Sequence, residues 1–542
     1  MIRPSPLIVS LLLAAACTGS AGLPRQASPS ESETTSAPSV SRSFVRMACD
    51  LPQQHLLRIW RGYHPERSGN IQYVPQAPNF VGNFSSHSGP WPYLQRVPLF
   101  LYGPGHVTGA GRMERPVTAA DIAPTIAELI GFDFRAPDGS PLHEAVAGGD
   151  TPPRLVVTVI WDGGGRDVLS AYRNRWPNVR TMIPGGTWYE NATVGSSPSV
   201  TPAIHSTIGT GAYPRTHGVV DLRFRIGGRL DPSALERTQQ LAVPALGDRY
   251  DLANGNRPVV GMLGPEGTLG MIGHGAGWEG GDRDIAAASE AGVWGLEGNN
   301  DRYYLFPEYV PGLGGLDEAV RRLDVADGQA DRRWMGHDVL DDPDGLTLTP
   351  AYAEYQTGLI AEMIRREGFG ADEVPDLLFV NYKQIDKVGH KWSFPSPEME
   401  AVVEASDRAV ADLVRILDEE VGKGRWALLL TADHGSTPRP EETGAIIIKN
   451  NVLEEDIQAR FDEDGDGREA VQSVRVTQMW MDEAELEDNG HTLEDVAAYV
   501  ATYTAGDNVR DPAELTAPPE TRLMAAAFPS SVLEGPLPCL GH

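Results

Sequence analysis

The sequence predicts an α/β fold, with a doubly wound, mostly parallel sheet flanked by helices. Four short apolar runs, rich in Val, Leu and Ile and without polar alternation, are typical of buried parallel strands. They are residues 155–161, 258–263, 376–382 and 426–432. Helical patterns separate these runs, most clearly at 118–131, 351–368 and 396–421. Strands that alternate with helices favour this fold class.

The pattern changes after residue 440. Two apolar runs, at 444–450 and 473–481, precede a helical pattern at 492–504. We therefore expect an α/β core over 151–440 and a small α+β appendage with a tail over 441–542.

The composition limits the partners of the chain. Its 542 residues, 41% of them hydrophobic, are consistent with one large α/β unit that carries insertions. The formal net charge of −29 argues against nucleic-acid polymers and anionic lipid surfaces, because binding to phosphate backbones needs Lys and Arg. A small anionic substrate stays compatible with this charge if metal ions supply local positive charge. The sequence does not indicate an oligomeric state.

The N-terminus predicts export. The apolar run at 7–16 is too short to span a bilayer and is typical of a signal-peptide core. The segment LAAAC, ending at Cys17, resembles a bacterial lipobox, which would make Cys17 the lipidated first residue of the mature chain. The alternative is a plain secretory signal that is removed together with Cys17. Residues 18–44 are rich in Ser, Thr and Pro and predict a flexible tether, so we expect a lipid-anchored protein on the extracytoplasmic face of a bacterial membrane.

Carboxylates and imidazoles follow three of the predicted strands. They are Asp162 after the first, Asp386 and His390 after the third, and Asp433 and His434 after the fourth. In open α/β sheets, ligands bind beyond the carboxyl ends of the strands. Mixtures of Asp and His suit zinc or another borderline divalent ion. Each pair alone is as easily a helix cap or a turn, but three strands deliver them to one edge of the sheet.

Thr201 is the candidate nucleophile. Pro202 is a preferred first residue of a helix, so Thr201 is expected at the N-cap. A hydroxyl there lies in the positive field of the helix N-terminus, which helps an alkoxide to form and a phosphoryl group to bind. An ordinary threonine cap is the alternative. His205 and His217, further along this stretch, are interpreted as structural.

These motifs together resemble the alkaline phosphatase superfamily. The segments are IWDGGG, SVTPAIHSTIGTGAYPRTHG, IDKVGH and TADHG, and the branch is that of type I phosphodiesterases and nucleotide pyrophosphatases. The resemblance implies a small phosphoester or nucleotide substrate, a covalent phospho-threonine at Thr201 and two zinc ions, with manganese as an alternative. It places one ion among Asp162, Thr201, Asp433 and His434. It places the other at Asp386, His390 and one further histidine.

His87 is expected to be that histidine. In the family the ligand follows the Asp-His motif, but after His434 this chain offers only His491 and His542, neither in a suitable setting. Residues 63–145 resemble the C-terminal portion of the family, with a His-containing loop before an apolar strand at 97–103. The chain therefore resembles a circularly permuted member, in which 45–150 is the displaced C-terminal portion.

Cys49 and Cys539 would flank the junction of this permutation. The two ends of the folded part must then lie close together, as they commonly do in domains. A disulfide between Cys49 and Cys539 is the favoured interpretation in an oxidising compartment, and two buried free thiols are the alternative.

The substrate-binding residues are less clearly indicated. Phosphodiesterases of this branch carry an Asn after the His-Gly turn, where this chain has Leu222, with Arg223 and Arg225 nearby as candidate phosphate ligands. Related monoesterases carry a Lys-x-Arg pair, where this chain has Gly264 and Glu266. A phosphodiesterase or pyrophosphatase is thus the first expectation. A phosphomonoesterase, a phospho-group transferase and a non-catalytic binding lipoprotein are the alternatives.

A calcium site is a further candidate. Asp462, Asp464 and Asp466 are spaced like the first half of a calcium loop. The twelfth position is Ser473 rather than Glu, so the bidentate ligand is missing and an acidic turn is the default interpretation.

Overall fold

The computed structural model describes residues 41–82, 86–149, 151–231 and 240–540. Cys17, most of the predicted tether and His542 lie outside these residues. The described chain begins with helix α1 (Arg42–Cys49), which takes up the last residues of the segment expected to be a tether. Within the described ranges, no helix is both long and apolar enough to cross a membrane.

The main sheet has ten strands in the described residues, in the order β11-β10-β9-β13-β5-β14-β3-β6-β4, with β12 beside β10. The strands are β3 (Leu99–Tyr102), β4 (Gly111–Thr118), β5 (Leu155–Trp161), β6 (Thr187–Thr193), β9 (Val260–Pro265), β10 (Asp284–Glu290), β11 (Val293–Trp294), β12 (Tyr304–Leu305), β13 (Asp376–Tyr382) and β14 (Trp426–Thr431). The central strands β10, β9, β13, β5 and β14 run parallel, whereas β3 is antiparallel to both of its neighbours. The predicted α/β fold class is confirmed.

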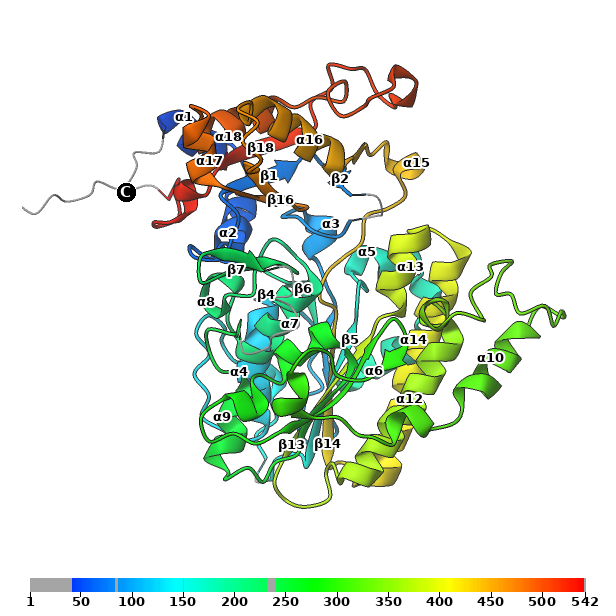
Figure 1. Cartoon of the computed structure of the whole chain (residues 1–542). Helices are drawn as coiled ribbons and strands as arrows, with labels where there is room; N and C mark the ends of the chain where they lie inside the picture. The colour runs from blue at the N-terminus through cyan, green and yellow to red at the C-terminus, as the bar shows by residue number, and fades with distance from the viewer. Residues whose placement is uncertain (1–40, 83–85, 150, 232–239, 541–542) are drawn as a thin grey trace, which may run out of the picture. The chain divides into compact units, whose positions relative to one another are not determined.

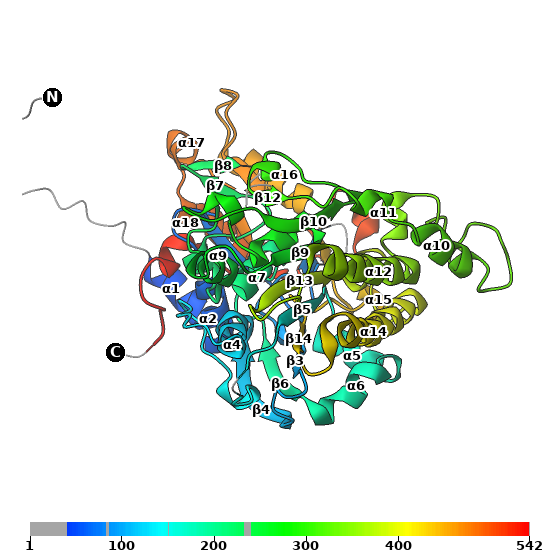
Figure 2. The same ribbon diagram turned by 90° about the horizontal axis from the view of Figure 1, so that it is seen from below.

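Helices cover both faces of this sheet, as Figures 1 and 2 show. Alternate residues of β5 enter two separate hydrophobic cores, with Val157 and Val159 in one and Val156 and Ile160 in the other. The first core is closed by α5 (Arg166–Ala171), α6 (Pro177–Met182), α10 (Leu316–Asp324), α12 (Pro350–Glu367) and α14 (Pro397–Leu417). The second is closed by α4 (Ile122–Leu129), α7 (Thr201–Thr210) and α9 (Leu246–Ala253). Burial on both faces explains why these strands are continuously apolar in sequence.

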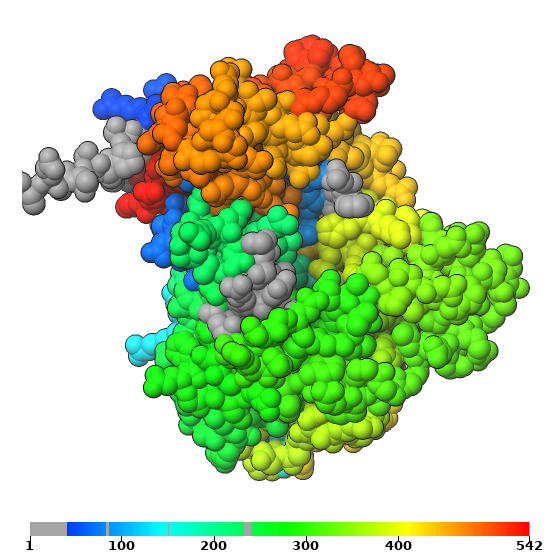
Figure 3. All heavy atoms as spheres, viewed as in Figure 1, coloured from blue at the N-terminus to red at the C-terminus, as the bar shows by residue number. Residues whose placement is uncertain are grey.

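A smaller sheet has the order β16-β17-β1-β18. Its strands are β1 (Ile71–Pro75), β16 (Val471–Val474), β17 (Gln478–Met481) and β18 (Met524–Pro529), and α1, α2 (Gln53–Gly62) and α18 (Leu493–Thr502) contribute to its core. Because β1 pairs with both β17 and β18, the α+β appendage contains N-terminal as well as C-terminal residues. In Figure 3, blue residues from the N-terminal section lie beside orange and red ones from the C-terminal section.

The two apolar runs of the appendage form short strands. The run at 473–481 is a hairpin of β16 and β17, not a single strand. The Arg475 N–H donates to the Gln478 carbonyl at 2.9 Å and closes the turn. The run at 444–450 contributes only the two-residue strand β15 (Ile447–Ile448), which pairs with β2 (Phe80–Val81).

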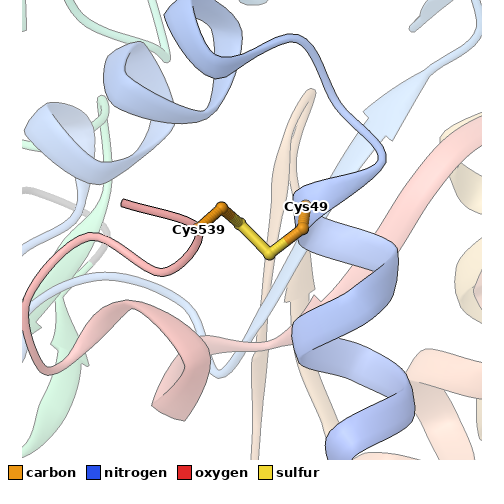
Figure 4. The surroundings of a disulfide bond; sticks show 2 residues. All are labelled: Cys49 and Cys539. Carbon is orange, nitrogen blue, oxygen red and sulfur yellow. A yellow bond between two sulfur atoms is a disulfide. The ribbon is translucent and has the colours of Figure 1, made fainter. Parts of the chain in front are cut away.

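The two ends of the described chain are joined covalently. Cys49, the last residue of α1, forms a disulfide with Cys539, with 5.6 Å between their Cα atoms (Figure 4). The bond lies at the edge of the smaller sheet and holds together two residues that are 490 positions apart in the chain.

Candidate active site

Six of the predicted ligands meet at the carboxyl edge of the main sheet. Their ligand atoms form two groups, each within 4.8 Å: His87, Asp386 and His390, and Asp162, Asp433 and His434. Asp162 follows β5 directly, and Asp433 and His434 come one residue after the end of β14. Asp386 and His390 lie four residues apart on α13 (Gln384–Trp392), the spacing that places two side chains on one helix face. His87 comes from the loop before α3 (Pro92–Gln95) and β3, the strand next to β14.

The Asp162 group is completely buried. His434 Nε2 lies 3.4 Å from Asp162 Oδ1 and 3.3 Å from Asp433 Oδ2. The Nδ1 of His434 pairs with the Gly435 carbonyl at 2.9 Å, which leaves Nε2 as the free lone pair. Within the described part of the chain, Asp433 Oδ2 and His434 Nε2 have no hydrogen-bond partner, an arrangement that is costly unless a ligand satisfies them.

In the His87 group, imidazole nitrogens likewise face a carboxylate oxygen. Asp386 Oδ1 lies 3.3 Å from His390 Nε2 and 3.7 Å from His87 Nε2. The Nδ1 of His87 pairs with the Ser199 carbonyl at 3.0 Å, which turns Nε2 toward Asp386. The rings of His87 and His434 stack with centroids 3.5 Å apart, so the two groups are in direct contact.

The spacing of these atoms fits divalent metal ions. A tetrahedral ion with bonds of about 2.0–2.1 Å sets its ligand atoms about 3.3–3.4 Å apart. The separations of 3.4, 3.3 and 3.3 Å around His434 and His390 match this spacing. Imidazole nitrogen with carboxylate oxygen is a donor set typical of zinc.

A glycine keeps the centre compact. Gly163, next to Asp162, has φ 71°, and a Cβ there would lie 2.9 Å from the Cα of Asp386. Its N–H donates to Asp433 Oδ1 at 3.1 Å. Only glycine combines this backbone conformation with so close an approach of the end of β5 to helix α13.

Electrostatics couple the two groups. Burial, and then the Asp162 carboxylate, raise the pKa of Asp433 to about 7. Burial disfavours the charged form of His434, but Asp433 and Asp162 raise its pKa to about 9. Burial likewise opposes ionisation of Asp386, yet His390 and Lys383 hold its pKa well below the usual value. The buried carboxylates of the two groups therefore depend on neighbouring cationic side chains, such as Lys383, to stay charged.

Lys383 is a functional candidate that sequence reasoning missed. Its Nζ lies 2.8 Å from Asp162 Oδ1 and 2.9 Å from Asp386 Oδ2, so it bridges the two groups. It also donates to Thr201 Oγ1 at 3.0 Å. The signal was present, since Lys383 directly follows β13 and precedes Asp386 by three residues. A search for metal ligands among Asp and His passes over a lysine.

Thr201 lies where the sequence placed it, with one correction. Helix α7 begins at Thr201 itself, and Val200 is the N-cap. The predicted N-cap position is thus wrong by one residue, because Pro202 occupies the second helical position rather than the first. The Oγ1 still lies in the first turn, where unpaired backbone N–H groups concentrate positive field.

The described geometry can now be compared with known proteins. Residues 156–525, more than half of the chain, match the model of the family described as type I phosphodiesterase / nucleotide pyrophosphatase. The chain belongs to this family. The match begins at β5, so it does not include His87 or the rest of the N-terminal section.

The chain is also similar to curated relatives and to a solved structure. The chain is 25% identical over 342 residues to a calcium-transporting ATPase of Myroides odoratus, covering 53% of this chain and 61% of the relative. It is 29% identical over 163 residues to alkaline phosphatase PafA of Elizabethkingia meningoseptica, covering 29% of this chain and 30% of the relative. The chain thus spans less than two thirds of either relative. A crystal structure of PafA superimposes with a TM-score of 0.52 at 17% identity, covering 70% of this chain and 85% of PafA, which shows a shared fold.

His205 is closer to the centre of this family member than the sequence suggested. Its Nε2 lies 3.6 Å from Asp433 Oδ2 and has no hydrogen-bond partner among the described residues. Its Nδ1 pairs with the Gly267 carbonyl at 3.2 Å, and burial lowers its pKa to about 4. His205 is therefore a neutral imidazole against the Asp162 group. His217, by contrast, pairs with Thr207 Oγ1 at 3.1 Å and holds the following turn.

The predicted phosphate-binding arginines have other contacts. Arg225 donates to Asn70 Oδ1 at 2.6 Å and to the Met481 carbonyl at 3.0 Å, which ties it to the smaller sheet. Arg223 is exposed, and its charge acts on Glu454 of α16 (Asn450–Phe461). No described contact supports the prediction that Arg223 and Arg225 bind substrate.

The predicted calcium loop has a different ligand set. The acidic group that lies within 4.8 Å is Asp462, Asp464 and Glu485, not Asp466. Asp466 pairs with Arg468 at 3.2 Å, and Arg468 also pairs with Glu485. The Asp464 side chain accepts the Asp466 N–H at 2.9 Å, as in an ordinary acidic turn. An arginine thus already supplies positive charge to this loop.

Proposed function

We propose that the chain is a metal-dependent hydrolase of small phosphoric esters that acts through a covalent intermediate at Thr201. One observation carries the proposal. Thr201 Oγ1 lies at a helix N-terminus and accepts a hydrogen bond from Lys383, the side chain that bridges both ligand groups. Membership of the phosphodiesterase/pyrophosphatase family supports the same reaction class.

Two zinc ions are the proposed cofactors, with manganese as the alternative. Asp162, Thr201, Asp433 and His434 would hold one, and Asp386, His390 and His87 the other. When bound, such ions lower the pKa of the nucleophile and neutralise charge on the leaving oxygen. The unpaired Asp433 Oδ2 and His434 Nε2, and the tetrahedral spacing of the donors, support this assignment.

The residues of the chain itself have distinct tasks in this mechanism. The Lys383 ammonium stabilises the alkoxide of Thr201, while the hydroxyl proton leaves to water. The Oγ1–P bond forms as the P–O bond to the leaving alcohol breaks, and water then hydrolyses the threonine ester to regenerate the hydroxyl. The N–H groups at the start of α7 attract the phosphoryl oxygens. The hydrogen bonds from His87 and His434 to backbone carbonyls keep both rings oriented.

A small cavity beside Lys383 is the proposed site of the leaving group. Its volume is about 90 Å³, and its lining includes Trp294, Tyr352, Gln356, Asn381, Lys383 and Lys387. Trp294 and Tyr352 are nearly parallel, 8° apart, and offer flat apolar surface. Lysines next to aromatic rings suit a small anionic ester better than a polymer.

Diester hydrolysis is the first candidate reaction, in line with the family and with Gly264 in place of a cationic residue. Monoester hydrolysis is the second candidate. It is favoured by Lys383, which places a cation beside Thr201 although the Lys-x-Arg pair of related monoesterases is absent. Side-by-side hydrolysis of bis(p-nitrophenyl) phosphate and p-nitrophenyl phosphate by the zinc-loaded chain separates the two. A diester preference supports the first candidate, and a monoester preference supports the second. If the chain is a transferase, it should phosphorylate an added alcohol. The proposal is overturned if the chain cleaves neither ester.

We also propose that the chain is exported, anchored by a lipid and circularly permuted. The lipobox-like segment supports lipidation of Cys17, and an extracytoplasmic location agrees with the disulfide of Cys49 and Cys539. The Cys17→Ser variant should move from the membrane fraction to the soluble fraction. The nearness of His87 to Asp386 supports a circularly permuted order, in which a segment ahead of β5 supplies the last ligand.

A further inference from the structure

A third group of ligand atoms lies at the opposite edge of the main sheet. Oxygens of Asp251, Asp282 and Asp284 lie within 4.8 Å of one another. Asp284 is the first residue of β10, whereas the candidate active site follows the carboxyl ends of the parallel strands. Seven residues of strand at about 3.3 Å each place the two edges roughly 20 Å apart. This group is therefore separate from the catalytic one.

Two of the three carboxylates are buried, and one of the two has an oxygen without a partner in the described chain. Asp251 is 4% exposed and Asp284 is 7% exposed, while Asp282 is open to solvent. Among the described residues, Asp251 Oδ1 has no hydrogen-bond partner. The neighbouring Asp248 differs, since its side chain accepts from the His274 N–H at 2.7 Å and from the Ala245 N–H at 2.7 Å. The unsatisfied atom thus belongs to the three-aspartate group.

Positive charge is missing from this group. No described lysine or arginine forms an ion pair with Asp251, Asp282 or Asp284, and carboxylates dominate their electrostatic surroundings. Arg283, between two of them in sequence, donates to the Asp301 carbonyl instead. Buried carboxylates that face one another are strongly destabilising unless a cation or a proton lies between them.

The acidic loop at 462–485 provides the contrast. There Arg468 pairs with Asp466, Asp488 and Glu485 and balances the carboxylates from within the chain. The group at Asp251 has the same type of donors but no such residue, so its carboxylates are balanced by protons or by an external cation.

A second buried oxygen without a partner in the described chain lies in the loop after α9. It is Oδ1 of Asn256. The backbone N–H of Asn256 donates to the Asp251 carbonyl at 2.9 Å, and its side-chain amide donates to the Gly280 carbonyl at 3.1 Å. The loop after α9 is therefore fastened to the segment that leads to Asp282. Donors made only of oxygen select hard cations, and calcium accepts the irregular shells that loops provide.

We propose that Asp251, Asp282 and Asp284 bind a calcium ion that fastens the end of α9 to the start of β10. The ion balances the buried carboxylates and fixes the amino end of a strand whose other end contributes Ser289 and Glu290 to the cavity beside Lys383. This proposal concerns stability and does not depend on the proposed reaction.

Calcium binding to the full chain tests the proposal, after chelation and reloading with zinc. Isothermal titration calorimetry should detect one calcium ion bound at this site, and 1 mM calcium should raise Tm by about 2–5 °C. Asp282→Asn, at an exposed position where folding is least at risk, should abolish both effects, and Asp251→Asn should do the same. Both variants should keep the zinc content and hydrolytic rate of the parent chain.

Asp464→Asn is the matched control in the other acidic loop, and it should keep the full calcium response. The proposal is overturned if the parent chain binds no calcium. It is also overturned if the response survives Asp282→Asn and Asp251→Asn or disappears in Asp464→Asn.

Discussion

The two edges of the main sheet carry clusters of different chemistry. At the carboxyl edge, the buried carboxylates Asp162 and Asp386 are balanced by Lys383 and lie against imidazoles. At the amino edge, the charges that act on the buried Asp251 and Asp284 are those of neighbouring carboxylates. Mixed nitrogen and oxygen donors suit a zinc-type ion that takes part in chemistry, whereas oxygen donors alone suit calcium in a structural role. The comparison shows that the type of donor, more than the number of acidic groups, separates the two sites.

Metal removal should have the largest effect and should separate the two edges. Chelation should lower the rate of hydrolysis at least about a thousandfold, because it removes the ions that are proposed to activate the nucleophile. Zinc alone should restore the rate without the calcium-dependent rise in Tm, and calcium alone should restore the rise in Tm without the rate. Rates and melting curves on the same samples provide the check. The comparison fails if one ion restores both.

His87→Ala should have the next largest effect. It removes one of the three proposed protein ligands of one ion, so the zinc content should fall by one ion per chain and kcat should fall at least about a hundredfold. Metal analysis and steady-state kinetics are the measurements. His143→Ala is the control, since that ring is exposed and pairs with Glu128 at the surface. Unchanged zinc content in His87→Ala would contradict both the ligand assignment and the permuted order.

Lys383→Met should lower kcat/KM about a hundredfold, the scale on which a single stabilising donor acts. The Lys391→Met variant, on the same helix, is the matched control. Lys391 is exposed, lies over the Trp392 ring rather than beside Thr201, and should leave kcat/KM nearly unchanged. A rate loss in Lys383→Met with full zinc content marks a role toward Thr201. Equal kinetics in the two variants would remove Lys383 from the mechanism.

Breaking the disulfide should have the smallest effect on activity. The Cys49→Ser/Cys539→Ser double variant should lower the free energy of unfolding by about 2–4 kcal/mol, with unchanged kcat, because neither cysteine belongs to the candidate active site. Denaturation of the parent chain with and without reductant should reproduce the difference. A loss of kcat in the double variant would show that the smaller sheet positions the catalytic edge.

The sequence indicated which carboxylates and imidazoles lie together better than it indicated the strands and side chains around them. Strands that are buried on both faces of a sheet can be recognised in the sequence as short, continuous apolar runs. The residues that follow these runs, Asp162, Asp386 and Asp433, were therefore expected at the carboxyl edge of the sheet. Strand β10 was missed because its core is three alanines, which carry little strand propensity, and Asp284 was missed with it. The position of β1 between β17 and β18 depends on pairing over some 400 residues, which no local pattern reveals. Lys383 follows β13 directly and could have been noticed in the sequence, whereas the nearness of His205 to Asp433 is visible only in the structure.

The central claim is that Thr201 is the nucleophile, and acid-quench mass spectrometry tests it most directly. The zinc-loaded chain should be mixed with p-nitrophenyl phosphate, or with the diester if that is the preferred substrate, quenched in acid and digested. The account predicts that the peptide containing Thr201 carries the transferred phosphoryl group and that Thr201→Ala loses both this adduct and hydrolysis while keeping its fold. An unmodified Thr201 in an enzyme that turns over, together with an active Thr201→Ala variant, would contradict it.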